Sequence, residues 1–396
     1  MSEKKEIGQS TKSIWGGEKE HKLYENSTQV PIVNSIAFGY KDIDTWQKVA
    51  LGIEEGHIYS RNTNPTVRTF EDKVKELENA EAATSFSSGM AAISNSLHTF
   101  LKSGDRVVSI NDLYGGTNLI LREFLPPLNI EVSLCQTDNH EQIINEITKG
   151  CKVVYLETPT NPTIKILDIK KLTTAAKKVG AISIVDNTFS TPINTNPLDL
   201  GADLVIHSAS KYLNGHADVM AGVLCGNKDL VKQVYHYREI NGACLSPTDA
   251  YYCLRGMKTL ALRVEKQNNS AMIIAKYLEK HPLINQVNYP GLESHNGHKI
   301  AKEQMRGYGG MLSYLLKGGL VAIKKMLPKL KYAHLAANLG AVESTTGIPA
   351  TTSHVECSSQ ERAAAGIPEG LIRLSVGIEN VEDLIDDLDQ ALNNLV

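Results

Sequence analysis

Short apolar runs alternate with segments of helical periodicity between Asn62 and Met257. Six runs rich in Val, Ile and Leu are predicted to be strands: Asp105–Ile110, Glu131–Cys135, Lys152–Glu157, Ala181–Asp186, Leu204–His207 and Ala221–Cys225. Three segments between them have the spacing of helices: 140–149, 166–179 and 228–238. Such alternation predicts a mostly parallel sheet with helices on both faces. Because ligands gather beyond the carboxyl ends of parallel strands, a site is expected there.

The chain of 396 residues exceeds the length at which a single hydrophobic core stops growing, so more than one domain is expected. Residues 1–61 contain few periodic runs and are predicted to form an arm that contacts a neighbouring subunit. Residues 62–257 are predicted to form the large domain. The following segment begins with a helical run over Leu260–His281 and ends with an amphipathic helix over Val381–Val396. Residues 258–396 are therefore predicted to form a smaller α/β domain.

The composition favours a small-molecule partner. The 41 Lys and Arg residues are dispersed among 44 Asp and Glu residues, which leaves no basic stripe for nucleic acid or for anionic lipid. No segment approaches the roughly 20 apolar residues of a membrane span, and the first residues are rich in charge. The six cysteines include no CxxC pair and are expected to be reduced core thiols. We therefore expect a soluble, cytoplasmic protein that binds neither nucleic acid nor membranes.

A lysine and an aspartate follow two of the predicted strands. Lys211 lies in Ser208-Ala209-Ser210-Lys211-Tyr212, after the strand Leu204–His207, and Asp186 ends the strand before it. A lysine amine can form a Schiff base with the aldehyde of pyridoxal 5'-phosphate (PLP). A carboxylate beside the pyridine nitrogen keeps that nitrogen protonated, so that the ring withdraws electrons from the substrate Cα. A lone lysine is usually solvated and Asp-Asn-Thr commonly ends a strand, but the pair together predicts a PLP site.

Two further motifs fit the same cofactor. Ser87-Ser88-Gly89-Met90, at the mouth of a helix, offers backbone N–H groups and the positive end of the helix dipole to a phosphate. Taken alone, this motif also fits an ordinary helix capped by serine. Tyr114 is followed by Gly115 and Gly116, which let a ring approach closely, so its side chain can stack on the pyridine. Without its neighbours, Tyr114 would be interpreted as a turn residue.

Other cofactor and catalytic motifs are missing from the sequence. GxxxxGK[ST] is absent and no GxGxxG follows the first strand, so nucleotide-binding folds lack their phosphate loop. The GxSxG motif of serine hydrolases is also absent. His295 and His298 are spaced too closely for the HExxH zinc motif and have no cysteine or carboxylate cluster nearby. We expect them to form a surface pair and expect no metal site.

Seven motifs are spread over nearly the whole chain. They are Tyr59-Ser60-Arg61 with Asn64-Pro65-Thr66, Ser87-Ser88-Gly89-Met90-Ala91, Tyr114-Gly115-Gly116-Thr117, Glu157-Thr158-Pro159-Thr160-Asn161-Pro162, Asp186-Asn187-Thr188-Phe189, Ser208-Ala209-Ser210-Lys211-Tyr212 and Ile372-Arg373-Leu374-Ser375-Val376-Gly377. Together they resemble the cystathionine γ-synthase/γ-lyase family of PLP-dependent enzymes of cysteine and methionine metabolism. The resemblance implies the aspartate-aminotransferase-like PLP-dependent transferase fold of type I, with a mostly parallel seven-stranded sheet.

The resemblance also implies three catalytic residues. Lys211 would be the Schiff-base lysine and would move protons. Asp186 would be the partner of the pyridine nitrogen. Tyr114 would stack on the ring and exchange a proton with the sulfur that leaves or enters. With the cofactor, these residues would catalyse elimination or replacement of a γ-substituent.

Further residues are implied to bind the cofactor phosphate. Gly89 and Met90 would donate backbone N–H groups, with the hydroxyls of Ser208 and Ser210 beside them. Position 210 is often threonine in the family, and serine keeps the hydroxyl. Thr188 is also expected to bind the cofactor.

The remaining implied contacts involve a second subunit and the substrate. Tyr59 and Arg61 would reach the phosphate from the adjacent subunit, which implies a homotetramer built as a dimer of catalytic dimers. Asn161 would contact the ring hydroxyl. Arg373 would bind the substrate carboxylate with two hydrogen bonds.

The sequence departs from cystathionine-handling relatives at three positions where they place polar or charged residues: Ile58, Leu119 and Ala337. A site without those groups discriminates less in favour of a substrate with a second charged end. Asn338, expected at the substrate, and Ile58 are similar to O-acylhomoserine sulfhydrylases, whereas Gly116 stands where methionine γ-lyases typically carry cysteine. We expect chemistry at Cγ of a homoserine or homocysteine skeleton, as in methionine γ-lyase or O-acylhomoserine sulfhydrylase.

Three alternatives remain open from the sequence. Cystathionine is a substrate if the missing charges are supplied from elsewhere. A catalytically silent relative would serve as a binding protein, although the joint presence of Lys211, Asp186, Tyr114 and Arg373 argues against it. An aminotransferase on the same fold would convert an added 2-oxo acid into an amino acid.

Overall fold

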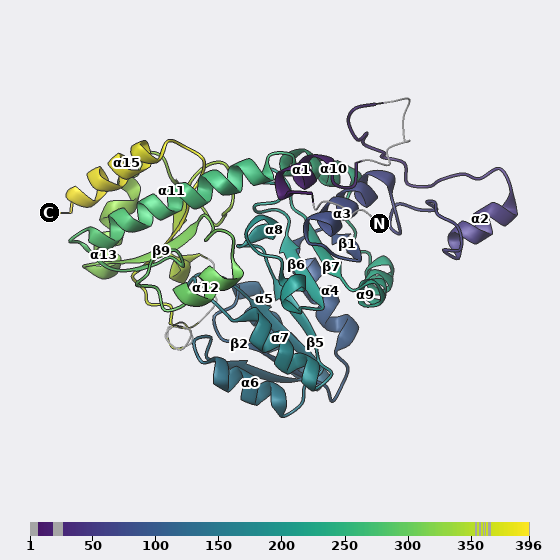
Figure 1. Ribbon diagram of the computed structural model, residues 1–396, viewed down its shortest axis with the longest axis horizontal. Coiled ribbons are helices and arrows are strands. Elements are labelled where there is room, and N and C mark those ends of the chain that lie inside the picture. Colours follow the sequence, from purple (N-terminus) through teal and green to yellow (C-terminus); the bar gives the residue numbers. More distant parts are fainter. Residues whose placement is uncertain are drawn as a thin grey trace, which may run out of the picture.

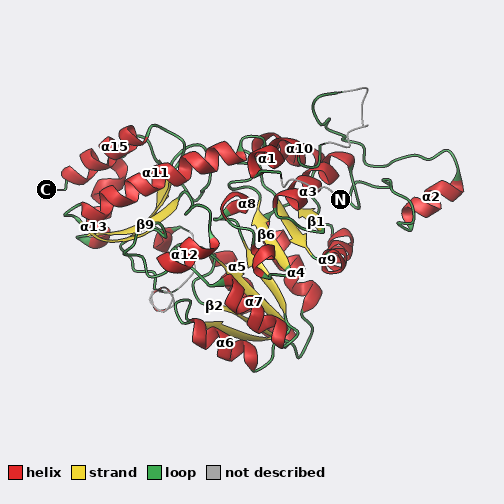
Figure 2. Ribbon diagram, in the orientation of Figure 1, coloured by secondary structure: helices red, strands yellow, loops and turns green. Residues whose placement is uncertain are grey.

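The computed structural model describes residues 7–18, 27–352, 355, 358, 360, 362 and 366–395. Its strands form two separate sheets, one of seven strands and one of five, and helices surround both (Figure 2). The long helix α11 (Leu260–Lys280) runs from the larger sheet to the smaller one (Figure 1). The α/β class predicted from the alternating pattern is confirmed.

The larger sheet is almost entirely parallel. Its strands are β1 (Ala82–Phe86), β2 (Arg106–Ile110), β3 (Glu131–Cys135), β4 (Val153–Glu157), β5 (Ile182–Asp186), β6 (Leu204–Ser208) and β7 (Gly222–Gly226). They lie in the order β1-β7-β6-β5-β4-β2-β3, and only β7 runs against its neighbours. The predicted mostly parallel, seven-stranded sheet is therefore confirmed. The six strands expected from apolar runs are all present, and β1 is the strand that the sequence did not reveal.

Both faces of this sheet are buried. Alternate side chains of a strand point to opposite faces. On β6, Leu204 and Ile206 pack into one hydrophobic cluster and Val205 packs into another. The helices on this part of the chain are α3 (Pro65–Leu77), α4 (Gly89–Phe100), α5 (Gly115–Leu119), α6 (His140–Thr148), α7 (Ile169–Lys178), α8 (Thr191–Asn194), α9 (Lys228–Asn241) and α10 (Pro247–Met257). Helices therefore cover both faces, as predicted, and the parallel strands end at a common edge.

The smaller sheet mixes parallel and antiparallel pairs around a core of its own. Its strands are β8 (Ile284–Asn288), β9 (Met311–Leu316), β10 (His334–Leu335), β11 (Thr345–Gly347) and β12 (Leu371–Ser375). Its helices are α12 (His298–Gln304), α13 (Gly319–Met326) and α15 (Val381–Asn393). Helix α15 packs its apolar face on α11, as the amphipathic pattern predicts. The last residue of the predicted helix, Val396, lies outside the described residues.

The amino-terminal segment contains two short helices that the sequence did not predict. Helix α1 (Gln9–Trp15) packs against α3, where the buried Lys73 bonds Glu18 at 2.6 Å. Helix α2 (Ile43–Ala50) lies on a loop that projects away from the body of the molecule (Figure 1). Ile43 is 76% exposed and Trp46 is 51% exposed. Apolar side chains so exposed on a projecting loop are typical of an interaction surface.

Shorter helical turns complete the described chain. They are a π-helical turn at Ile120–Phe124 and 3-10 turns at Pro126–Leu128, Pro197–Leu200, Leu327–Lys329 and Pro349–Thr351. None of the helices in the described ranges is long and apolar enough to cross a bilayer. The five cysteines in these ranges are free, although Cys151 and Cys244 are only half-buried. Cys357 lies outside the described residues.

Candidate active site

A cavity of about 810 Å³ opens at the carboxyl ends of β4, β5 and β6. Most of the residues predicted from the sequence line it: Gly89, Met90, Tyr114, Asn161, Asp186, Thr188, Ser208, Ser210, Lys211, Asn338 and Arg373. Asn338 and Arg373 reach it from the smaller sheet region, while the others come from the larger one. The sheet topology explains this meeting, because parallel strands end at a common edge.

The amine of Lys211 faces this cavity from the turn that follows β6. Its Nζ donates to Oδ1 of Asn338 at 2.9 Å. Burial and the positive charge of Arg373 lower the pKa of Lys211 to about 8. A larger share of the amine is therefore neutral near neutral pH, which is the form that attacks an aldehyde or accepts a proton.

Asp186 lies at the end of β5 and is almost fully buried. Its Oδ1 accepts from the backbone N–H of Thr188 at 3.0 Å, and its Oδ2 accepts from the hydroxyl of Tyr155 at 3.4 Å. Burial raises the pKa of Asp186, although the bonds from Thr188 oppose the shift. A protonated ring nitrogen facing this carboxylate would offset the cost of burying its charge.

The amino-terminal end of α4 forms a cradle beside β6. Ser88 caps the helix by accepting from the N–H of Ala91 at 3.1 Å. Helix geometry gives the first-turn amides of Gly89 and Met90 no acceptor inside the helix. A Cβ added at Gly89 would lie 2.7 Å from Cβ of Ser208, so only glycine lets this turn approach the strand end so closely. Donors arranged in this way suit a phosphate group.

The hydroxyls predicted around the phosphate differ in their contacts. Thr188 accepts the backbone N–H of Ser208 through its hydroxyl at 2.9 Å, which joins the ends of β5 and β6. Ser210 accepts the N–H of Ala221 at 2.9 Å and donates to the same residue's carbonyl at 3.3 Å. Both contacts fix the turn that carries Lys211.

Tyr114 stands at the entrance of α5 and is 40% exposed. Its backbone N–H donates to Oε2 of Glu157 at 3.0 Å. A Cβ added at Gly116 would lie 3.0 Å from the Tyr114 ring and 2.9 Å from the sulfur of Met90. The space that a cysteine would fill at position 116 is therefore already bounded by Met90 and by the tyrosine ring.

Arg373 crosses from the smaller sheet on β12 and is buried at the cavity. Its Nη1 donates to Oδ1 of Asn161 at 2.9 Å, and its Nη2 donates to the carbonyl of Asn338 at 3.2 Å. Burial lowers the pKa of Arg373 to about 10, so it stays protonated near neutral pH. The guanidinium is thus held in place for a carboxylate.

Tyr59 and Arg61 do not line the cavity of their own chain. They lie at the end of the projecting loop, where Tyr59 bridges to Ala37 and the Arg61 guanidinium stacks 5.3 Å from the Tyr59 ring. Their predicted contact with a neighbouring subunit stays a prediction.

Sequence reasoning gave no role to several residues that line the cavity, among them Phe189 and Glu157. Phe189 follows Thr188 and faces the same space. Glu157 is buried at the end of β4 and bonds two backbone N–H groups. The sequence placed Glu157 at the end of an apolar strand, but local patterns assigned it no contact or role.

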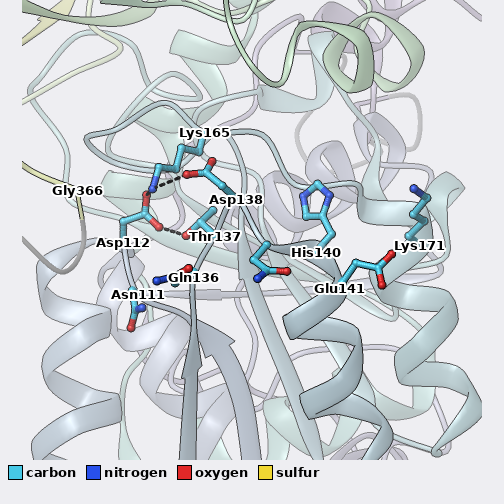
Figure 3. A pocket seen from close by; sticks show the side chains of 11 residues that line it. Asn111, Asp112, Gln136, Thr137, Asp138, His140, Glu141, Lys165, Lys171 and Gly366 are labelled. Atoms are coloured by element: carbon cyan, nitrogen blue, oxygen red, sulfur yellow. Dashed lines mark hydrogen bonds and ion pairs between the residues drawn. The ribbon is translucent and has the colours of Figure 1, made fainter.

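A second, polar hollow of about 680 Å³ lies beside the loop that precedes Tyr114. Lys165 lies there between Asp112, at 3.4 Å, and Asp138, at 3.1 Å (Figure 3). Burial alone would lower the pKa of Lys165, but the two carboxylates outweigh it and raise the pKa. The hollow contains none of the residues predicted to bind PLP.

His295 and His298, expected to form a surface pair, are only partly exposed. Both rings are half-buried, and a ring nitrogen of each bonds a backbone carbonyl, of Ile164 at 3.1 Å and of Pro290 at 2.9 Å. These contacts fix the segment before α12. Within the described ranges, no three His, Cys, Asp or Glu side chains are grouped to hold a metal ion.

The donor set at the larger cavity fits PLP, because it combines a lysine amine of lowered pKa, a buried carboxylate and a glycine cradle at a helix end. Similarity to known proteins points the same way. The family described as Cys/Met metabolism PLP-dependent enzyme matches residues 10–393.

An L-methionine γ-lyase of Fusobacterium nucleatum subsp. polymorphum is 44% identical over 99% of this chain and 100% of its own length. A cystathionine γ-lyase of Bacillus subtilis is 43% identical over 89% of this chain and 93% of its own. The crystal structure of cystathionine γ-synthase from Xanthomonas oryzae pv. oryzae in complex with cystathionine superposes with a TM-score of 0.93, at 36% identity and covering 98% of this chain and 99% of that one. The chain therefore belongs to the Cys/Met metabolism family of PLP-dependent enzymes, as the resemblance predicted.

Proposed function

We propose that this enzyme eliminates or replaces the γ-substituent of an amino acid with a homoserine or homocysteine skeleton and an uncharged distal group. Methionine is the first candidate, and water would complete its conversion to methanethiol, 2-oxobutanoate and ammonia. The observation that carries the proposal is a cavity in which Lys211 and Arg373 face an apolar wall. That wall includes Ile93, Val219, Met220, Ala337 and Leu339.

When bound, PLP supplies an electron sink for the charge that develops at Cα of the substrate. Arg373 binds the substrate carboxylate and so fixes the position of Cα. Nζ of Lys211 accepts the proton from Cα and delivers it to a neighbouring carbon. It then accepts a proton from Cβ, and the electron pair left on Cβ expels the γ-substituent. The carboxylate of Asp186 holds a proton on the ring nitrogen. The hydroxyl of Tyr114 delivers a proton to the departing sulfur.

The preference for an uncharged distal group rests on what the cavity lacks. Three positions differ from cystathionine-handling relatives, and of these Ala337 lines the cavity. Its side chain carries no charge. Leu119 lies one turn beyond Tyr114 on α5 but does not line the cavity, and Ile58 lies on the projecting loop. A substrate with a second charged end would therefore find fewer polar partners in this cavity than in relatives that carry an acidic side chain at the position of Ala337.

Cystathionine is the second candidate, supported by the similarity to a cystathionine γ-lyase and a cystathionine γ-synthase. O-acylhomoserine is the third, supported by Asn338, which holds the amine of Lys211. In that reaction a thiol would replace the acyl group.

We also propose a homotetramer of two catalytic dimers, in which the loop with Tyr59 and Arg61 completes the cavity of an adjacent subunit. The exposed apolar residues of α2 support this arrangement. A cytoplasmic location is proposed as well, supported by the free thiols in the described part of the chain.

One comparison of substrates tests the proposed function. Purified holoenzyme is incubated separately with methionine, with cystathionine, and with O-acetylhomoserine or O-succinylhomoserine plus a thiol. Release of 2-oxobutanoate from methionine at the highest kcat/KM supports the proposal. Turnover of cystathionine alone would assign the second candidate, and thioether formation alone would assign the third.

A further inference from the structure

Glu157 joins two parts of the cavity that are far apart in the sequence. Its Oε2 accepts from the backbone N–H of Tyr114 at 3.0 Å, and its Oε1 accepts from the backbone N–H of Asn161 at 2.8 Å. One carboxylate therefore fixes the backbone below the tyrosine ring and the loop that follows β4. The side chain is almost fully buried, so water does not compete for these bonds.

The chain of contacts continues to the other side of the cavity. Oδ1 of Asn161 accepts from Nη1 of Arg373 at 2.9 Å. Glu157 is thus connected through one residue to the guanidinium and through one peptide group to the tyrosine ring. A rigid connection of this kind determines how far apart the two lie.

The position of Glu157 is costly. It pairs with Asp186 in the register of β4 and β5, which places two buried acids side by side. Burial, together with the charge of Asp186, raises the pKa of Glu157 well above its usual range. An apolar residue would avoid this cost but would leave two buried N–H groups without acceptors.

The same loop is also fixed from its opposite side, by Asp112. The hydroxyls of Thr160 and Thr163 both donate to Oδ2 of Asp112, the former at 3.3 Å. Asp112 therefore stabilises the loop from within the polar hollow. Glu157 is the carboxylate that faces the cavity and connects to both Tyr114 and Asn161.

We propose that Glu157 is a positioning residue that sets the separation between the Tyr114 ring and the Arg373 guanidinium across the cavity. The choice of substrate for its test rests on the proposed function, but the geometry does not. Tyr114 and Arg373 contact the reacting molecule, and Glu157 acts through them.

The test compares holoenzyme of E157Q with a matched control, D203N. Asp203 directly precedes β6 at the amino end of that strand, whereas Glu157 lies at the carboxyl end of β4. Asp203 likewise accepts a backbone N–H, from Ser183 at 2.8 Å, and accepts from the Ser183 hydroxyl at 2.7 Å. In E157Q the amide nitrogen cannot accept, so either Tyr114 or Asn161 loses its acceptor. We expect kcat/KM to fall about 10-fold in E157Q and by no more than about two-fold in D203N.

Two further readouts separate positioning from a general loss of stability. The visible circular-dichroism band of bound cofactor, recorded without substrate, should change in E157Q and not in D203N. The effect of E157Q should be smaller in a Y114F or an R373K background than in the parent, because the residues act through a common geometry. If E157Q does not fold, E157D replaces it, since the shorter side chain withdraws both oxygens from their donors.

An unchanged dichroism band with kcat/KM within about two-fold of the parent would overturn the proposal. The proposal would also be overturned if, in both double variants, the loss of kcat/KM equalled the product of the losses in the two single variants. Failure of the parent enzyme to act on methionine would contradict the proposed function alone, because the dichroism comparison needs no substrate.

Discussion

Two lysines in this protein lie in hollows that contain a buried aspartate, yet the charges that act on the two amines are opposite in sign. Lys165 lies between Asp112 and Asp138, and its pKa is raised. Lys211 bonds the neutral amide of Asn338 and faces the positive charge of Arg373, and its pKa falls to about 8. The first lysine is held as a cation, and the second is prepared to lose its proton.

The comparison teaches that residue types alone do not identify a reactive lysine. Both side chains are half-buried, and both lie close to a strand end. What distinguishes Lys211 is the absence of a carboxylate contact to its Nζ among those found in the described chain. Near Lys211 the buried acid, Asp186, faces the cavity, where a cationic ring would meet it.

Replacement of the two lysines should give the largest contrast. K211A is expected to lose the visible absorbance of bound cofactor and to reduce kcat by about a thousand-fold or more, because Lys211 is the only lysine among the described residues that line the cavity. K165M should keep the absorbance band. Spectra and turnover of the purified variants check this expectation, and appreciable turnover by K211A would remove the proposed mechanism.

The two aspartates should differ in the kind of damage they cause. D186N is expected to reduce kcat/KM about 100-fold with little change in thermal midpoint, because an amide no longer holds the ring nitrogen protonated. D112N should instead lower stability by about 2 kcal/mol, since Thr160 and Thr163 lose a charged acceptor. Steady-state kinetics and thermal unfolding separate the two results. If D112N reduced kcat/KM as much as D186N does, the expected difference between the two aspartates would be contradicted.

Labelling at different pH sharpens the comparison between the amines. Only a neutral amine reacts with an acylating reagent. In cofactor-free protein, the rate at Lys211 should rise with pH and level above about 8, because its pKa is lowered to that value. The rate at Lys165 should still be rising at its ordinary pKa of 10.5, because its pKa is raised. Peptide mass spectrometry measures both rates in one sample. Identical pH profiles would show that the two environments do not differ.

The smallest expected effect comes from placing an acid near Lys211. A337E adds a carboxylate at the wall beside Asn338 and makes this environment more like that of Lys165. We expect kcat/KM for methionine to fall about five-fold and the ratio for cystathionine over methionine to rise. A337Q is the matched uncharged control. An equal change in both variants would assign the effect to size.

The sequence predicted best that residues lie together where they end a strand or follow it closely. Lys211 and Asp186 each come after an apolar run, and the parallel sheet brings those ends together. Strand β1 escaped detection because Ala82-Ala83-Thr84-Ser85-Phe86 has a single large apolar side chain. Its place beside β7 depends on tertiary pairing, which local patterns do not encode.

Contacts between residues far apart in the sequence could not be predicted from the sequence. The bond from Lys211 to Asn338 spans 127 residues, and that from Arg373 to Asn161 spans 212. Local periodicity carries no information on such pairs, so Asn161 was expected at the ring hydroxyl and its bond to Arg373 was missed. The domain boundaries after residues 61 and 257 stay predictions.

Arg373, the proposed substrate clamp, and Lys211, the proposed reactive amine, belong to different sheets: Arg373 lies on β12, and Lys211 follows β6. Any tilt of one sheet relative to the other changes the distance between them. With the proposed roles, recognition of the substrate carboxylate would be coupled mechanically to alignment of the amine with Cα. A substrate analogue without the carboxylate would lose both the contact with Arg373 and the alignment of Cα with the amine. Decarboxylated analogues should therefore be poor substrates even when their side chains fit.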